Sequence, residues 1–180
     1  ILTRLPSHFP SAILVSQHMP KGFTKPFTER LAKLSRIKID EAADGDILEA
    51  GRALICPGGC HITLKKINDE VMVVLKESTA RDKYVPSVDI MMSCASEEFG
   101  PLAMGVILTG MGNDGKAGIV EIKNKGGYTI AEAESTAVIF GMPNEAIKTG
   151  AIDKVLPLHE IAGEITATVV EKKDKRWKKN

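Results

Sequence analysis

The stretch Met-Gly-Val-Ile-Leu-Thr-Gly-Met-Gly-Asn-Asp-Gly, residues 104–115, decides the fold class of this chain. Its first half, Met104–Thr109, is a short apolar run rich in β-branched residues, which predicts a strand. Glycines follow at positions 110, 112 and 115, and Gly115–Lys125 has the periodicity of a helix. A strand that passes through a glycine turn into a helix is typical of α/β proteins with a parallel sheet.

The same alternation continues in both directions and predicts an α/β fold with a doubly wound, mostly parallel sheet. Only Lys66–Glu70 separates two of the strands, so we expect those two to form an antiparallel hairpin. The opening Ile1–Leu5 has the character of a helix end, so we expect a strand and a turn of this sheet to precede Ile1. The predicted strands are Ala12–Ser16, Ile37–Asp40, Ala53–Cys56, His61–Lys65, Val71–Lys76, Met104–Thr109, Tyr128–Ala131 and Ile152–Leu156, and the predicted helices are Gly22–Leu34, Val88–Phe99, Gly115–Lys125, Pro143–Lys148 and Leu158–Val170.

Length and composition narrow the class of protein. A chain of 180 residues, 43% of them hydrophobic, is sufficient for one compact domain. The net charge of +1 gives no overall field that would attract nucleic acid or an anionic membrane. No apolar run approaches the roughly 20 residues that span a bilayer, so we expect no membrane insertion. The sparse cysteines, Cys56, Cys60 and Cys94, favour a reducing cytoplasm.

A first candidate for catalysis lies in the turn after Ala12–Ser16. His18 stands at the carboxyl end of that strand, in a turn fixed by Pro20 and Gly22. Ligands of open α/β sheets collect at this edge, and an imidazole titrates near neutral pH, so His18 is a candidate general base. The alternative is a turn histidine that is hydrogen-bonded to a carbonyl.

The glycine turn Gly110–Gly115 has the G-x-G-x-x-G spacing of dinucleotide-binding proteins, and Glu132 or Glu134 follows about 20 residues later. The Asp114 carboxylate opposes this interpretation, because it would repel a pyrophosphate at the helix N-terminus. The same helix N-terminus would instead lower the pKa of Asp114 and suit it to orienting an imidazolium, unless Asp114 is a simple N-cap. The glycines also allow backbone N–H groups near Met111 to point into the site, as an oxyanion hole requires.

Two further turns are expected to have structural and not catalytic roles. Phe140–Glu145 opens a helix with Pro143 near its first position and is expected to shape the rim of the site. Cys56–His61 holds two thiols and an imidazole, but its C-x₃-C spacing and the lack of a second ligand pair favour a glycine turn over a metal site. We therefore expect no metal site at this turn. No serine or cysteine lies in the strand-to-helix elbow of an activated nucleophile.

These motifs, in this order, resemble the catalytic domain of the chemotaxis protein-glutamate methylesterases. The resemblance extends from about Ser11 to Val155 and includes Ser16–Pro20 with Gly22–Thr24, Pro57-Gly58 with His61, Pro86–Asp89, Gly105–Gly115, and Phe140–Pro143 with Glu145–Ile147. It implies a Ser-His-Asp triad, in that chain order, on a doubly wound α/β sheet. By this resemblance His18 is the general base, Asp114 orients it, and the Met111 N–H is an oxyanion donor. The resemblance implies no metal and no cofactor.

The family's nucleophile lies in a Gly-Ala-Ser-Thr-Gly-Gly turn, and this sequence contains no such motif. We therefore expect the serine, with the first strand, upstream of Ile1, so that residues 1–180 are one catalytic domain without its N-terminal part. A receiver domain is expected further upstream.

Val85 also departs from the family's pattern, because relatives often carry Arg at this position. The resemblance implies hydrolysis of glutamyl methyl esters, with possible glutamine deamidation, on cytoplasmic segments of chemoreceptors; the alternative is a nucleotide- or phosphate-binding module that uses Gly110–Gly115.

Overall fold

The computed structural model describes residues 1–177, and of residues 172–177 it describes only the helical backbone. Strands and helices alternate along the chain, with short 3-10 helices at Leu2–Arg4 (η1) and Gly100–Leu102 (η2). The strands are β1 Ile13–Val15, β2 Lys38–Glu41, β3 Arg52–Ile55, β4 Cys60–Ile67, β5 Glu70–Glu77, β6 Met104–Ile107, β7 Tyr128–Glu132 and β8 Lys154–Leu156. The helices are α1 Thr24–Leu34, α2 Val88–Phe99, α3 Lys116–Asn124, α4 Met142–Ile147 and α5 Leu158–Trp177.

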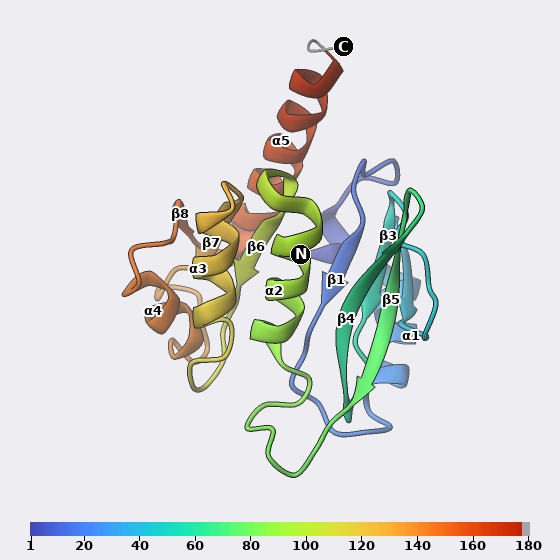
Figure 1. Ribbon diagram of the computed structural model, residues 1–180. Helices are drawn as coiled ribbons and strands as arrows, with labels where there is room; N and C mark the ends of the chain where they lie inside the picture. The colour runs from blue at the N-terminus through green and yellow to red at the C-terminus, as the bar shows by residue number, and fades with distance from the viewer. Residues whose placement is uncertain (178–180) are drawn as a thin grey trace.

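The strands form two parallel sheets and one antiparallel hairpin (Figure 1). The first parallel sheet has the order β1-β3-β2, and the second has the order β6-β7-β8. The hairpin pairs β4 with β5 over their whole lengths. The predicted mixed α/β fold, mostly parallel with one hairpin, is therefore confirmed. The parallel strands are divided between two sheets, and no described residue pairs with the outer edge of β1 or of β6.

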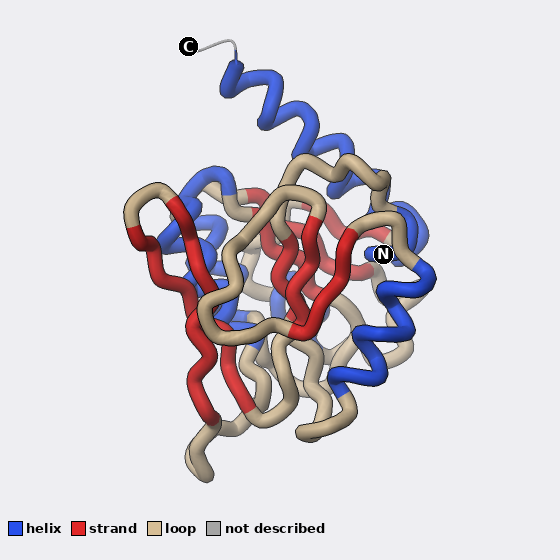
Figure 2. The backbone as a smooth tube through the Cα atoms, turned by 90° about the vertical axis from the view of Figure 1, so that its right-hand side faces the viewer, coloured by secondary structure: helices blue, strands red, loops and turns tan. Residues whose placement is uncertain are grey.

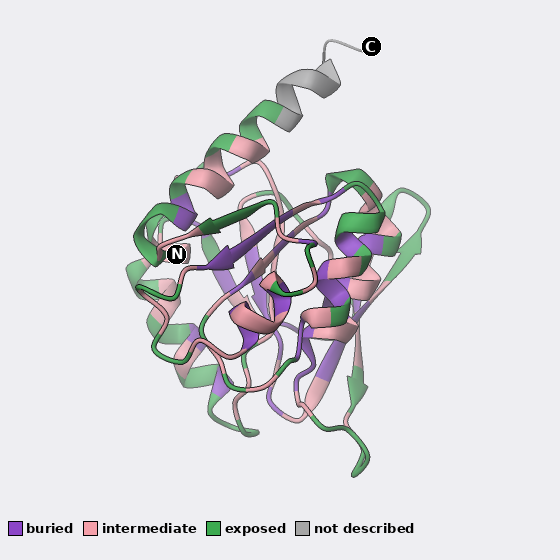
Figure 3. Ribbon diagram, turned by 90° about the vertical axis from the view of Figure 1, so that its left-hand side faces the viewer, coloured by how far each residue is buried: buried purple, intermediate pink, exposed green. Residues whose placement is uncertain are grey.

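Three apolar clusters form the core. One lies between α2, α3 and the sheet of β6, with Ile107, Ile119 and Ile122 almost fully buried. A second packs α1 and α5 on the first parallel sheet, and a third packs the hairpin against α2 and that sheet. Figure 3 shows the buried residues concentrated in the strands and on the inner faces of the helices. The far end of α5 extends beyond this body (Figure 2).

Several boundaries differ from the sequence prediction for local reasons. The hairpin strands are longer than predicted, because Asn68 adopts a left-handed conformation, with φ of 55°, that closes a tight turn. β6 ends at Ile107 instead of Thr109, because the Thr109 N–H donates to the buried Glu132 carboxylate and leaves the ladder. The expected helix end at Ile1–Leu5 is only the single 3-10 turn η1.

The α2–α3 contact depends on one glycine. A Cβ added at Gly118 would lie 2.5 Å from the Met92 Cβ and 3.3 Å from the Asp89 backbone. These atoms belong to the body of α2, so they cannot move aside independently. Gly118 therefore sets how closely the two helices approach each other.

The Gly118→Ala substitution is expected to lower the free energy of unfolding by about 1–3 kcal/mol, because the added methyl overpacks the α2–α3 interface. Chemical denaturation followed by circular dichroism measures this change. Gly163→Ala in α5 is the matched control, because a Cβ there meets nothing within 4 Å. The control is expected to gain roughly 0.5–1 kcal/mol from helix propensity. Equal effects of the two substitutions would contradict this account of the packing.

Candidate active site

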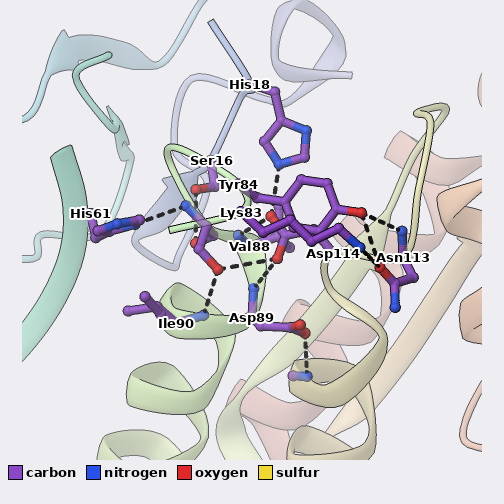
Figure 4. Close-up of polar contacts among 12 residues, drawn as sticks. Ser16, His18, His61, Lys83, Tyr84, Val88, Asp89, Ile90, Asn113 and Asp114 are labelled. Carbon is purple, nitrogen blue, oxygen red and sulfur yellow. Dashed lines mark hydrogen bonds and ion pairs between the residues drawn. The ribbon is translucent and has the colours of Figure 1, made fainter. Parts of the chain in front are cut away.

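Three loops meet at the carboxyl ends of β1 and β6: the turn after each strand and the segment that leads into α2 (Figure 4). They bring His18 and Asp114, which are 96 positions apart, into direct contact. The His18 Nε2 lies 2.7 Å from the Asp114 Oδ2. The two side chains that the sequence singled out as base and orienting acid are thus hydrogen-bonded partners.

The carboxylate of Asp114 is held by the N-terminus of α2. Its Oδ2 accepts the Val88 N–H at 2.7 Å, and its Oδ1 accepts the Asp89 N–H at 3.0 Å and the Ser87 hydroxyl at 3.1 Å. Asp114 is only 1% exposed, and this burial alone would raise its pKa. The hydrogen bonds from His18, Asp89 and Val88 outweigh burial and lower the pKa of Asp114 below its ordinary value.

The pKa of Asp114 is lowered, as the sequence predicted, but the helix responsible is not the predicted one. The predicted cause was the helix that begins after Gly115, whereas the donors belong to α2. Asp114 is not the N-cap of α3 either, because that position is Gly115, with φ of +90°. The sequence could not identify these donors, because Val88 and Asp89 precede Asp114 by about 25 positions.

The N-terminus of α3 is occupied by a different carboxylate. The Asp89 Oδ1 accepts the Gly118 N–H at 2.8 Å, so a carboxylate of α2 accepts an N–H of α3 while Asp114 accepts N–H groups of α2. Burial and the nearby Asp114 charge raise the pKa of Asp89, and the bond from Gly118 opposes them. A phosphate at the start of α3 would meet Asp89 in place of free N–H groups. The dinucleotide interpretation of Gly110–Gly115 is therefore not supported.

The bond to Asp114 determines the chemistry of the His18 ring. An ionised carboxylate only accepts hydrogen bonds, so the neutral imidazole carries its proton on Nε2. The other nitrogen, Nδ1, then has a free lone pair and makes no hydrogen bond within the described chain. The His18 side chain is 29% exposed, so a reactant can reach it. Nδ1 is thus the nitrogen able to accept a proton.

Tyr84 supports the other side of the imidazole, and sequence reasoning missed it. Its ring stacks on His18, with centroids 5.4 Å apart and planes 15° apart. Its hydroxyl donates to the Asn113 Oδ1 at 3.0 Å and accepts the Asn113 N–H at 3.3 Å. The Lys83 Nζ lies over the Tyr84 ring, 4.9 Å from its centroid. No local pattern marks Tyr84, because its contacts come from turns distant in sequence.

Met111 stands at the exposed tip of the glycine turn, with 74% of its surface accessible. Its N–H donates to no other residue that the structure describes. The turn is closely packed: a Cβ at Gly112, where φ is +95°, would lie 2.3 Å from the Tyr84 hydroxyl. Gly141 touches the same turn, since a Cβ there would lie 2.6 Å from the Gly110 carbonyl oxygen. The Phe140–Glu145 turn therefore supports this rim.

The serines near the imidazole have other partners. The Ser16 hydroxyl donates to the Ser87 carbonyl oxygen at 3.2 Å, and the Ser87 hydroxyl donates to Asp114. No serine hydroxyl of the described residues is bonded to His18. A cavity of about 410 Å³ adjoins His18 and is lined also by Met19, Pro20, Lys21, Gly59 and Val85.

The thiols of the Cys56–His61 turn do not converge with carboxylates or imidazoles on a metal site. Among residues that the structure describes, no group of three or more His, Cys, Asp or Glu side chains could hold a metal ion. Burial raises the pKa of the Cys56 thiol to about 12, and that thiol donates to the Cys60 carbonyl. Gly58 packs against the His18 turn, because a Cβ there would lie 2.5 Å from the Pro20 carbonyl oxygen.

No helix in the described part of the chain is both long enough and apolar enough to cross a bilayer.

Comparison with known proteins gives consistent matches over nearly the whole chain. The family model described as CheB methylesterase matches residues 1–165. A protein-glutamate methylesterase/protein-glutamine glutaminase of Geobacter sulfurreducens is 53% identical over 165 residues, which are 92% of this chain and 44% of that protein. A Pyrococcus abyssi protein of the same name is 41% identical over 94% of this chain and 46% of its own length. The chain thus spans about half the length of these relatives.

A solved structure agrees with the sequence matches. The crystal structure of the Thermotoga maritima CheB methylesterase catalytic domain superposes with a TM-score of 0.91 and 40% sequence identity. The match covers 94% of this chain and 89% of that one.

The lowered pKa of Asp114 predicts how stability depends on pH. Its stabilising contribution is fully present above the unfolded-state pKa of about 3.9 and is lost as the pH falls through the folded-state pKa. Comparing the unfolding free energies of the parent protein and Asp114→Asn between pH 7 and pH 3 isolates this contribution. We expect the difference between them to shrink below about pH 4. A constant difference over the whole range would contradict the assignment.

Proposed function

The chain belongs to the CheB methylesterase family, and we propose that it supplies the base and the orienting acid of a protein-glutamate methylesterase. The observation that carries the proposal is the 2.7 Å bond between the His18 Nε2 and the buried Asp114 carboxylate, with no partner for Nδ1 among the residues that the structure describes. The base nitrogen is Nδ1 and the orienting contact is at Nε2, the reverse of the usual serine-protease template.

The first half of the reaction acylates a serine. The serine hydroxyl attacks the glutamyl ester carbonyl and gives its proton to the His18 Nδ1. Asp114 stabilises the resulting imidazolium, and the Met111 N–H binds the oxyanion of the tetrahedral intermediate. The intermediate then expels methanol, which takes the proton back from His18, and leaves an acyl-enzyme.

The second half regenerates the enzyme. Water gives a proton to the His18 Nδ1 as it attacks the acyl carbon, and the serine leaves with that proton. The freed γ-carboxylic acid then loses its remaining proton to water and becomes the carboxylate. A glutamine side chain would follow the same route, with ammonia leaving in place of methanol. The relatives' names include both activities.

The nucleophile is proposed to come from outside these 180 residues, on a strand that fits between β1 and β6. Each of these strands has an edge to which no described strand pairs. The apolar β1 residues Ile13, Leu14 and Val15 are only half-buried, whereas strands of a doubly wound sheet are covered on both faces. An inserted parallel strand would join the two sheets and end beside His18. The edges thus support the expectation of an upstream strand and turn.

The proposed substrates are methylated glutamates on cytoplasmic segments of chemoreceptors. The greater length of the relatives also leaves room for a receiver domain upstream, with residues 1–180 as one incomplete catalytic domain. No cofactor takes part in the proposed reaction.

Asp114→Asn in the full-length protein is expected to reduce kcat for methanol release by roughly 10⁴-fold, as for the orienting acid of other triads. The amide would force the wrong tautomer on His18. The assay measures methanol released from methylated receptor. Lys154→Ala is the control, because its side chain pairs with Glu164 in α5 and makes no hydrogen bond or ion pair with His18 or Asp114. An Asp114→Asn enzyme with near-normal activity would overturn the proposed role.

A further inference from the structure

His61 is a buried imidazole that the proposed reaction does not use. It lies in β4, 4% exposed, and its side chain points toward the start of α2 (Figure 4). The His61 Nδ1 accepts the Ser87 N–H at 3.0 Å. Because Nδ1 acts as an acceptor, the ring proton is on Nε2, which lies 3.4 Å from the Asp82 Oδ2. That separation gives an electrostatic contact and not a short hydrogen bond.

Ser87 is fixed through its backbone and its side chain together. His61 holds its N–H, and the Ser16 hydroxyl holds its carbonyl oxygen at 3.2 Å. Its own hydroxyl accepts the Ile90 N–H at 3.3 Å, as the N-cap of α2, and donates to Asp114 at 3.1 Å. Any shift of Ser87 therefore displaces both the first turn of α2 and the carboxylate that this turn holds.

We propose that His61 is a positioning residue: through Ser87, it sets the place and orientation of the Asp114 carboxylate and hence the His18 ring. The path has three contacts, each at hydrogen-bond distance, from His61 to Ser87, from Ser87 to Asp114, and from Asp114 to His18. His61 itself makes no hydrogen bond or ion pair with His18 or Asp114. The catalytic consequence rests on the proposed function, but the effect on His18 does not.

The positioning role requires the hydrogen-bond acceptor at the His61 Nδ1, and does not require the imidazole ring itself. In His61→Asn the amide oxygen stands two bonds from Cβ, as Nδ1 does, and can accept the Ser87 N–H. In His61→Leu the volume is filled, but the Ser87 N–H loses its partner in a buried site, which is costly. Comparing His61→Asn with His61→Leu therefore separates the effect of the lost hydrogen bond from the effect of a changed side-chain volume.

Thr63→Val is the matched control for stability. Thr63 lies two residues along β4, is 6% exposed, and donates its hydroxyl to the Val74 carbonyl at 3.0 Å. Its loss removes a buried hydrogen bond from the same strand without touching Ser87. If a change in the His18 resonance or in kcat results only from lower protein stability, Thr63→Val shows the same change.

The test is proton NMR of the full-length protein labelled with ¹⁵N-histidine, in which the His18 Nε2–H bonded to Asp114 gives a low-field resonance that disappears in His18→Gln. We expect His61→Leu to broaden or abolish this resonance, and His61→Asn and Thr63→Val to retain it. A sharp, unshifted resonance in a folded His61→Leu protein overturns the proposal, as does its loss in Thr63→Val. This readout needs no esterase activity, so it fails or succeeds independently of the proposed function.

Kinetics provide the second readout. We expect His61→Leu to lower kcat roughly ten- to a hundredfold, the scale of a misplaced catalytic group, with KM within about twofold of the parent value. His61→Asn is expected to restore most of kcat. A change confined to KM, or no rescue by His61→Asn while the NMR resonance is retained, would contradict a positioning role.

Discussion

A reciprocal exchange of carboxylates between two helix N-termini is the interaction on which the rest of the site depends. Asp114, two residues before α3, accepts N–H groups of α2, and Asp89, in the first turn of α2, accepts an N–H of α3. Each helix therefore supplies the charge that stabilises the other's N-terminus. The close approach at Gly118 makes this exchange possible, because it brings the two helix starts within reach.

The same carboxylate that stabilises the N-terminus of α2 also orients the imidazole of His18. Asp114 accepts hydrogen bonds from α2 and still directs Oδ2 to the His18 Nε2 at 2.7 Å. A buried carboxylate with this many donors remains ionised and fixed in orientation. His18 is then bonded at Nε2 and stacked on Tyr84, and its Nδ1 has no hydrogen-bond partner among the described residues, as the proposed role of a base requires.

Most of the strands and helices, and the two polar side chains of the candidate site, could be predicted from the sequence. The supporting contacts could not, because they join segments that are distant along the chain. Strand periodicity located the elements, and the position of His18 and Asp114 at strand ends predicted that they would meet. The sequence could not identify α2 as the donor to Asp114, nor Tyr84 and His61 as supports, because these contacts join turns separated by 25 or more positions. Nor could periodicity show that β1 and β6 each have an edge to which no described strand pairs.

The central claim is that His18 activates a serine that is not among these 180 residues. The most direct measurement is the intact mass of the full-length protein before and after treatment with a fluorophosphonate probe, followed by peptide mapping of any adduct. The account predicts a single adduct, on a serine outside residues 1–180, which does not form in His18→Ala. No adduct on the parent protein, or an adduct on a serine within residues 1–180, would contradict it.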